Sequence, residues 1–305
     1  MMDMSDSPQL RGSLKADEPM ARHVSWRAGG AARTFYQPAS IADLCAFLRT
    51  RAPEEAVLFV GLGSNLLVRD GGFDGTVILT HHALSGITQQ GAGIRPTFTA
   101  GAGVPAPHLA RYVAKHGGAG AEFLAGIPGT IGGALAMNAG CYGGETWEHV
   151  LAVETVDRNG NLRTRGAADY ASSYRHVELK GGGEEWFVSG VFVFERGVEA
   201  DAMARMKALL SKRVASQPLN QPNAGSVFRN PPGDFAARLV ESCALKGVNI
   251  GGAQVSPKHA NFIVNTGTAT AADIEALMDL VQTTVRLRTG IDLVREVRVV
   301  GKTKA

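Results

Sequence analysis

The chain lacks clustered cysteines, a long apolar run and an excess of charge of either sign. Its three cysteines, Cys45, Cys141 and Cys243, contain no C-x-x-C pair, which excludes a disulfide framework and a cysteine zinc site and is typical of a reducing compartment. Lys and Arg total 31 against 28 Asp and Glu, so the net charge of +3 indicates no nucleic-acid partner. No apolar run reaches about 18 residues and no signal peptide begins the chain, so we expect a cytoplasmic protein without a membrane or metal partner.

Glycine is the residue type in excess. The chain has 38 glycines among 305 residues, about one in eight, whereas about 7% is usual. The 45% hydrophobic content and only 13 prolines exclude a disordered or collagen-like chain. Glycine in a chain with a real core predicts tight turns, or backbone that closely approaches another group.

Apolar spacing predicts helices mixed with strands but no regular βαβ series, hence an α+β fold. Ser40 is the expected N-cap of a helix over 40–48, and Asp234 that of a helix with Gly247 as its C′ residue. Other expected helices cover 105–117, 200–214 and 273–287, and expected strands cover 56–60, 73–79, 95–100, 150–156, 186–194 and 262–264.

Two glycine-dense loops, 61–67 and 126–140, combine small residues with free backbone amides and contain no lysine. Such amides can surround a pyrophosphate, although a tight turn packed against a strand has the same sequence pattern. A Walker motif is absent, and the G-x-G-x-x-A pattern at 101–106 is a poor Rossmann loop because Pro105 removes an amide. Two loops of this kind favour a dinucleotide held by backbone amides.

At these loops the sequence resembles the UDP-N-acetylenolpyruvoylglucosamine reductase (MurB) family. Further pieces of the chain resemble the same family and follow in the right order. Any one of these motifs is weak, but together they extend the resemblance over about residues 24–301. The motifs are Ser173-Tyr174-Arg175, Asn223-Ala-Gly-Ser226-Val-Phe-Arg-Asn230-Pro, Leu245-Lys-Gly-Val, Pro257-Lys-His-Ala-Asn-Phe-Ile-Val-Asn265 and Glu296-Val-Arg298.

The resemblance implies an α+β fold in several parts. An FAD-binding domain of the vanillyl-alcohol-oxidase/p-cresol-methylhydroxylase type, built from two subdomains, would precede an α+β substrate-binding domain. We expect a loose N-terminal tail over 1–20, an FAD-binding domain over 21–214 with subdomains of about 21–80 and 81–214, a substrate-binding domain over 215–296, and a final strand, 297–305, that rejoins the first subdomain.

The resemblance also implies a reaction. In this family NADPH reduces non-covalently bound FAD, which then reduces the enolpyruvyl group of UDP-N-acetylglucosamine-enolpyruvate to UDP-N-acetylmuramate. The chain would therefore be an FAD-dependent NADPH oxidoreductase of peptidoglycan precursor synthesis, with a place in cell-wall biogenesis, cell shape and cell division. Its expected partners are NADPH and the UDP-sugar, and we expect a monomer.

Arg175 and Ser226 match two catalytic residues of the family. Hydride addition to the substrate pushes charge onto its carboxylate, which a guanidinium meets in a bidentate manner. The alternative for Arg175 is a solvated surface arginine, since Arg163 and Arg165 lie nearby in sequence. Ser226 would donate a proton to C2 of the enolpyruvyl group, because a small neutral hydroxyl can be re-protonated from water.

Glu296 matches the family's acidic residue, which would assist at the developing enolate or orient the proton donor. We expect it on a strand over 293–300, where it would share a face with Arg298. An exposed ion pair with that arginine is the alternative. Val294 and Arg295 precede it where the family commonly has an acidic residue and proline.

Two further sets of residues carry over from the family's motifs. The glycine loops would supply the FAD contacts, and the motifs after them would supply the substrate contacts. The implied FAD contacts are Gly61, Gly63, Ser64, Asn65, Leu66, Gly126, Ile127, Pro128, Gly129, Thr130, Gly132 and Gly133, and the implied substrate contacts are Tyr174, Asn230, Arg213, Lys258 and Asn261.

No tyrosine lies between Arg175 and Ser226, so the chain resembles the shorter variety of the family that lacks a tyrosine lid loop. Two alternatives remain open. One is an alcohol or hydroxyacid oxidase on the same fold, with the flavin tethered through a histidine such as His81, His82 or His108. The other is a non-catalytic nucleotide-binding protein.

Overall fold

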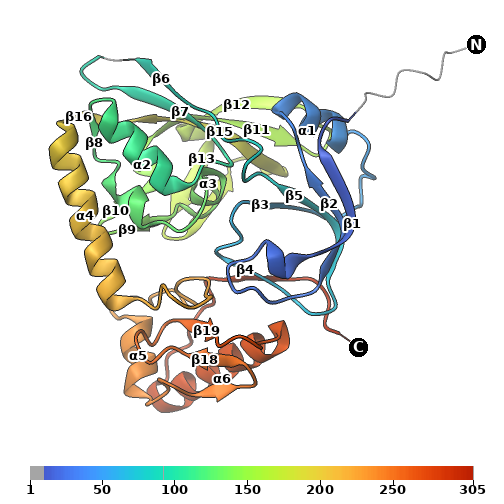
Figure 1. Cartoon of the computed structure of the whole chain (residues 1–305), viewed down its shortest axis with the longest axis vertical. Coiled ribbons are helices and arrows are strands. Elements are labelled where there is room, and N and C mark those ends of the chain that lie inside the picture. The colour runs from blue at the N-terminus through green and yellow to red at the C-terminus, as the bar shows by residue number, and fades with distance from the viewer. Residues whose placement is uncertain (1–9, 92, 305) are drawn as a thin grey trace, which may run out of the picture. The chain divides into compact units, whose positions relative to one another are not determined.

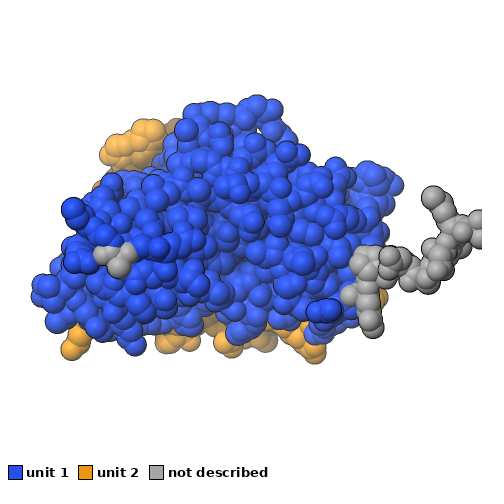
Figure 2. All heavy atoms as spheres, turned by 90° about the horizontal axis from the view of Figure 1, so that it is seen from above, with its two compact units in different colours: residues 1–15, 35–61, 76–206 blue, residues 16–34, 62–75, 207–305 orange. Residues whose placement is uncertain are grey.

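The computed structural model describes residues 10–91 and 93–304, and Figure 1 labels its helices and strands. Its mixture of helices and mostly antiparallel sheets agrees with the predicted α+β class. The chain divides into two compact units, coloured in Figure 2, and each unit is assembled from separate stretches of sequence. The described residues of unit 1 are 10–15, 35–61, 76–91 and 93–206, and those of unit 2 are 16–34, 62–75 and 207–304.

Unit 1 contains a five-stranded antiparallel sheet of order β12-β11-β15-β7-β6 (Figure 1). Phe192 of β15 lies opposite Phe98 of β7, and both side chains are buried. Buried side chains of α2 and α3 belong to the same hydrophobic cluster, so these helices pack on the sheet. The strands of this sheet are β6 (Ile87–Gly91), β7 (Thr97–Gly101), β11 (Val150–Asp157), β12 (Leu162–Gly166) and β15 (Glu185–Val193), and the unit also contains the helices α1 (Ile41–Leu48), α2 (Ala106–Lys115) and α3 (Ile131–Met137). Three further pairs of short strands are β9 (Gly140–Cys141) with β10 (Gly144–Glu145), β13 (Tyr170–Ser173) with β14 (His176–Leu179), and β8 (Gly118–Ala119) with β16 (Glu195–Arg196).

Helices α1 and α2 begin where the sequence predicts. The Ser40 hydroxyl caps α1 by accepting a hydrogen bond from the Asp43 backbone N–H at 3.1 Å. Pro105 is the N-cap residue of α2 and Pro107 lies in its first turn, where an amide hydrogen would have no helical partner. Gly117, with φ of +75°, follows the end of this helix.

The N-terminal segment differs from the expected loose tail. Residues Ser13–Pro19 form strand β1 at the edge of a four-stranded sheet of order β1-β2-β5-β3. Glu18 is the one buried side chain of β1. Backbone pairing therefore holds this strand in the sheet, and the hydropathy of its sequence does not predict a strand. Residues 1–9 of the expected tail lie outside the described residues. The other strands are β2 (Ala31–Gln37), β3 (Val57–Val60) and β5 (Phe73–Leu79).

Unit 2 is built around helix α6, whose buried face is the one that apolar spacing predicts. One hydrophobic cluster joins this face to α5 and to the antiparallel sheet β17-β18-β19. Helix α4 carries the chain from unit 1 to unit 2. The bounds are α4 (Glu199–Ser216), α5 (Ala236–Ser242), α6 (Ala271–Thr289), β17 (Asn249–Ile250), β18 (Ala253–Val255), β19 (Ile263–Asn265), β4 (Leu66–Val68) and β20 (Arg298–Val300).

Segment 62–75 belongs to unit 2 through partners far along the chain. Strand β4 pairs in parallel with β20. The carboxylate of Asp70 accepts hydrogen bonds from the first two backbone amides of α6 at 3.0 and 2.9 Å, which adds to the cap of that helix. The guanidinium of Arg69 donates both Nε and Nη2 to the Glu275 carboxylate, at 2.8 and 2.9 Å.

Segment 16–34 joins unit 2 through Trp26. Its side chain is fully buried, and its Nε1 donates to the carbonyl of Ile263 at 2.7 Å. The Asn265 side-chain amide in turn donates to the Trp26 carbonyl at 2.9 Å. The indole N–H and the backbone carbonyl of Trp26 are therefore both hydrogen-bonded inside the core of unit 2.

Three expected local features are wrong. Asn230, not Asp234, caps α5 by accepting from its first backbone amide at 3.1 Å, because the Asp234 carboxylate accepts from the preceding amide at 2.7 Å. Helix α5 ends at Ser242, and Ala244 rather than Gly247 takes the left-handed position after it, with φ of +54°. Glu296 precedes β20 and lies on no regular strand face.

We expect the stability of unit 1 to depend on the protonation of His149. Its ring stacks on Phe123 and packs against Phe194, with centroid distances of 5.5 and 4.8 Å. Burial lowers the pKa of the His149 imidazole, whereas the unfolded chain has the ordinary pKa of about 6.5. The unfolded state therefore binds more protons, and the free energy of unfolding falls as the pH drops below about 6.5.

Urea unfolding at about pH 7.5 and about pH 5.5 measures this loss. His149→Gln should show a smaller drop between the two pH values than the parent chain does. His116→Gln, at an exposed position on the same unit, is the control and should behave like the parent. An equal drop in all three proteins would contradict the assignment.

Candidate active site

In unit 1 the loop 126–133 brings Thr130 against Gly61. Thr130 is the N-cap residue of α3 and only 2% exposed. A Cβ atom at Gly61 would lie 2.1 Å from Thr130 Oγ1 and 2.8 Å from its Cγ2, so no larger residue fits. Within the part of the chain that the structure describes, Thr130 Oγ1 is buried without a hydrogen-bond partner. A buried hydroxyl left unpaired costs about 1–3 kcal/mol, so this atom indicates a polar ligand group.

The same loop is fixed to the segment before α2 by backbone hydrogen bonds. The Ala106 N–H donates to the Gly129 carbonyl at 2.9 Å, and the Gly132 N–H donates to the Ala102 carbonyl at 2.8 Å. A Cβ atom at Gly132 would lie 2.9 Å from the Cβ of Ala102. Close backbone packing therefore explains part of the glycine content, as the alternative interpretation of this loop predicts, while the unpaired Thr130 hydroxyl requires a further explanation.

Arg175 occupies the two-residue turn between β13 and β14. Its φ of +55° lies in the left-handed region, which a non-glycine residue occupies at a cost in free energy. Its Nη2 donates to the Gly140 carbonyl at 2.8 Å and its Nη1 to the Asn138 carbonyl at 3.5 Å. The guanidinium carbon lies 5.0 Å from the ring centre of Tyr174. A strained turn and an anchored guanidinium favour a functional role over that of a solvated surface arginine.

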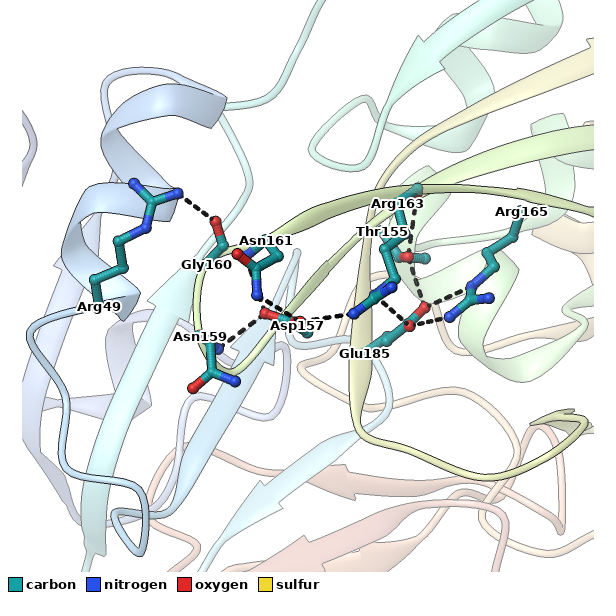
Figure 3. Close-up of polar contacts among 9 residues, drawn as sticks. All are labelled: Arg49, Thr155, Asp157, Asn159, Gly160, Asn161, Arg163, Arg165 and Glu185. Carbon is teal, nitrogen blue, oxygen red and sulfur yellow. Dashed lines mark hydrogen bonds and ion pairs between the residues drawn. The ribbon is translucent and has the colours of Figure 1, made fainter.

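Arg163 and Arg165 are held in a different way. Figure 3 shows both guanidinium groups directed at the Glu185 carboxylate, with Arg163 also close to Asp157. Arg165 Nη2 lies 2.5 Å from Glu185 Oε1, and the Thr155 hydroxyl donates to Oε2 at 2.7 Å. The hydrogen bond from Arg165 lowers the pKa of Glu185 below its ordinary value, so the cluster stays ionised. These two arginines of β12 therefore stabilise the sheet through ion pairs with Asp157 of β11 and Glu185 of β15.

In unit 2 the backbone of Glu296 links the Ser226 segment to the first glycine loop. Ser226 follows a turn in which Gly225 has φ of +75°. The Glu296 N–H donates to the Val227 carbonyl at 2.8 Å, and the Glu296 carbonyl accepts from Asn65 Nδ2 at 3.2 Å. Unit 2 thus brings together two predicted catalytic residues and one predicted FAD contact.

Asn261 holds the Ser226 segment from inside the unit. It is 4% exposed, and its side chain accepts from the Phe228 N–H at 3.0 Å and donates to the Phe228 carbonyl at 2.8 Å. The Asn261 carbonyl also accepts from the Val227 N–H at 2.9 Å. Both polar atoms of this amide thereby shape the loop, and the substrate contact that the family's motif implies stays a prediction.

The remaining predicted substrate residues also have partners within unit 2. Asn230 caps α5. Lys258 Nζ donates to the Val214 carbonyl at 2.6 Å, and Arg213 Nε donates to Gln217 Oε1 at 2.9 Å. These bonds fix the positions of the three side chains.

Arg229 is a candidate that the sequence analysis missed. It lies between Ser226 and Asn230 and is partly buried. Among the described residues its side chain has no hydrogen-bond or ion-pair partner, and its Nε is buried. A guanidinium is always charged, so a buried N–H of this kind favours an anionic ligand. A basic residue inside a motif was visible in the sequence, but its lack of a partner was not.

Other site types find no support in the described residues. No group of three or more His, Cys, Asp or Glu side chains among them could hold a metal ion. Over the same residues, no helix is both long and apolar enough to cross a membrane. Among the described residues, Cys45, Cys141 and Cys243 form no disulfide.

Comparison with known proteins decides the family. Residues 32–166 match the family model of an FAD binding domain, and residues 217–300 match the UDP-N-acetylenolpyruvoylglucosamine reductase C-terminal domain. The UDP-N-acetylenolpyruvoylglucosamine reductase of Thiobacillus denitrificans is 55% identical over 306 residues, which cover 97% of this chain and 94% of that protein. The protein of the same name from Legionella pneumophila (strain Corby) is 52% identical over 301 residues, covering 98% and 96%. The chain belongs to the UDP-N-acetylenolpyruvoylglucosamine reductase family.

A solved structure of this family supports the fold as well. The crystal structure of UDP-N-acetylenolpyruvylglucosamine reductase (MurB) from Thermus caldophilus has a TM-score of 0.76 and 30% identity, covering 95% of this chain and 98% of that one. The predicted family and fold class, an FAD-binding domain followed by a reductase C-terminal domain, are confirmed. The chain is accordingly an FAD-dependent oxidoreductase of peptidoglycan precursor synthesis.

The residues around Thr130 fit the FAD that this family uses. FAD carries a pyrophosphate, which needs hydrogen-bond donors and close backbone approach rather than bulky side chains. The unpaired Thr130 hydroxyl supplies a donor, and Gly61 lets the backbone of the first glycine loop approach it closely. Thr130 and the backbone beside it would hold the pyrophosphate of FAD.

We expect Thr130→Val to act in opposite directions on cofactor and protein. The variant loses the unpaired hydroxyl, so the FAD-free protein should be at least as stable as the parent, while the Kd for FAD rises about tenfold. Thr155→Val is the matched control, because that buried hydroxyl donates to Glu185. It should lower stability and leave FAD affinity unchanged. Fluorescence titration with FAD and urea unfolding measure both quantities, and an unchanged Kd in Thr130→Val would refute the assignment.

Proposed function

We propose that the protein reduces the enolpyruvyl group of UDP-N-acetylglucosamine-enolpyruvate to UDP-N-acetylmuramate, with NADPH as the electron source. Bound FAD would accept a hydride from NADPH and pass it to C3 of the enolpyruvyl double bond. The observation that carries the proposal is the pair of bonds on the Glu296 backbone, which hold the Ser226 segment beside Asn65 in unit 2.

Ser226 is the proposed proton donor. As the hydride adds to C3, the Ser226 O–H bond breaks, its proton goes to C2, and the serine oxygen recovers a proton from water. The bonds from Asn261 and Glu296 to the two residues after Ser226 support this role, since they fix the backbone next to the hydroxyl. Glu296 is proposed to orient that hydroxyl or to assist at the developing enolate.

Arg175 is proposed to bind the substrate carboxylate. Hydride addition makes this group more electron-rich, so a fixed cation stabilises the transition state more than the ground state. Its strained turn and its bond to the Gly140 carbonyl support the role, because an anchored guanidinium loses little freedom on binding. Tyr174 beside it is proposed to line the same pocket.

Arg229 is proposed to pair with the diphosphate of the UDP-sugar, together with the predicted contacts Asn230, Arg213 and Lys258. If Arg175 takes the carboxylate, the diphosphate is the other anionic group of the substrate. A charge-assisted hydrogen bond from the buried Nε to a phosphate oxygen would satisfy that atom.

The wider assignments are proposals of the same kind. The two glycine loops would hold FAD without a covalent bond, and the enzyme would act as a cytoplasmic monomer with NADPH and the UDP-sugar as its small-molecule partners and with no nucleic-acid or membrane partner. Its product would support cell-wall biogenesis, cell shape and cell division. The FAD-binding domain is proposed to span 21–214 and the substrate-binding domain 215–296.

Ser226→Ala should separate the two halves of the reaction. Bleaching of the flavin absorbance by NADPH should continue at the parent rate, whereas re-oxidation by the enolpyruvyl substrate should slow by about 100- to 10,000-fold. Ser242→Ala, whose hydroxyl bonds only within its own helix turn, is the control. Stopped-flow absorbance measures both halves. Parent-like re-oxidation in Ser226→Ala would exclude the serine as proton donor.

Arg229→Gln should weaken binding of the UDP moiety. Calorimetric titration with UDP, which has the diphosphate but no carboxylate, should show a Kd raised about tenfold or more, as expected for a lost charge-assisted bond. Arg238→Gln removes an exposed arginine of the same unit that pairs with Asp234, and should leave the Kd unchanged. Equal Kd values in Arg229→Gln and the parent would rule out the diphosphate contact.

A further inference from the structure

Asn138 is a buried polar residue of the second glycine-dense loop, and the proposed chemistry gives it no role. It is 2% exposed and ends α3 in the left-handed conformation, with φ of +40° and ψ of 52°. A buried amide is costly unless its donors and acceptor are paired, and here both ends are. Its Oδ1 accepts from the Trp147 N–H at 3.0 Å, and its Nδ2 donates to Glu145 Oε2 at 2.8 Å and to the Ser173 carbonyl at 3.2 Å.

Two of the contacts around Asn138 converge on Arg175. Ser173 is the last residue of β13 and lies opposite His176 across the turn that contains Arg175. The Arg175 guanidinium turns back and donates to the carbonyls of Gly140 and Asn138. Residues 138–140 thus hold both the entry to the turn and the charged end of the arginine.

We propose that Asn138 is a positioning residue for Arg175: its side chain fixes the turn and the two carbonyls that aim the guanidinium. The inference rests on the proposed role of Arg175 in the reduction of the enolpyruvyl substrate. A carboxylate is bound in a bidentate manner only when the guanidinium plane is fixed. Displacement of a binding group by about 1 Å can cost about 100-fold in rate.

Asn138→Gly tests the side chain without disturbing the backbone. Glycine adopts the left-handed conformation freely, so this variant removes three hydrogen bonds but keeps the end of α3. Ala244→Gly, at an exposed left-handed position of unit 2, is the matched control for a change to glycine. It should have parent-like kinetics.

The expected effect is confined to one half of the reaction. In Asn138→Gly, re-oxidation of the reduced flavin by the enolpyruvyl substrate should slow by about 10- to 100-fold, with Arg175 still in place. Flavin reduction by NADPH should stay within about twofold of the parent, because it does not involve the substrate carboxylate. An equal loss in both halves would show a merely structural role and overturn the proposal.

A double-mutant cycle with Arg175→Lys shows whether Asn138 acts through the arginine. If it does, adding Asn138→Gly to Arg175→Lys should slow re-oxidation by no more than about threefold further, because the guanidinium is already gone. Additive losses would overturn the proposal. If Arg175→Lys itself leaves re-oxidation unchanged, the proposed role of Arg175 fails; if it slows re-oxidation and Asn138→Gly does not, only the positioning role fails.

Glu145 provides a second test in case Asn138→Gly does not fold. Glu145→Ala removes one acceptor of the Asn138 amide and leaves the bonds to Ser173 and Trp147. It should slow the same re-oxidation step by a smaller factor, about threefold to tenfold. Glu145→Gln retains an acceptor oxygen and should restore the rate. A rate in Glu145→Gln as low as in Glu145→Ala, or no slowing in either variant, would count against the proposal.

Discussion

The parallel pairing of β4 with β20 is the constraint on which unit 2 depends. It places Asn65 next to Glu296, residues that are 231 positions apart, and the Glu296 backbone continues the chain of hydrogen bonds to the Ser226 segment. Asn261 closes this arrangement from the core side. The backbone beside the proposed reacting residues is thus held by hydrogen bonds that do not use the Ser226 hydroxyl.

In unit 1 one short helix, α3, positions two of the proposed site residues. The loop before α3 presents the unpaired Thr130 hydroxyl beside Gly61, and the residues after the helix anchor Arg175. Seven residues therefore separate a proposed cofactor contact from the support of a proposed substrate contact. A shift of α3 would displace both Thr130 and the carbonyls that anchor Arg175. The buried residues of this helix therefore affect the proposed site as well as packing.

The sequence predicts the features that depend on local chemistry. The capped helix α1 and the buried face of α6 follow from a serine before an apolar repeat and from 3.6-residue spacing. Strand β1 could not be predicted, because its pairing involves the backbone and most of its side chains are exposed. The sequence did not predict the cap of α5 or the support of Arg175 for another reason. Asn230 and Asn138 bind partners that the spacing of residues does not identify. Family motifs supplied the catalytic candidates, whereas the lack of a partner at Thr130 Oγ1 and Arg229 Nε depends on the folded surroundings of these atoms.

The contact between Trp26 and Ile263 has a consequence for synthesis of the chain. The two residues are 237 positions apart, so at about 5–20 residues per second the ribosome needs about 12 to 47 s to make the partner after the tryptophan. Unit 1 can be completed within that interval, since its last described segment ends at residue 206. During this time a large apolar ring that ends fully buried has no core to enter. The nascent N-terminal segment therefore stays exposed for that interval, so its risk of aggregation depends on the order of translation as well as on the stability of the finished fold.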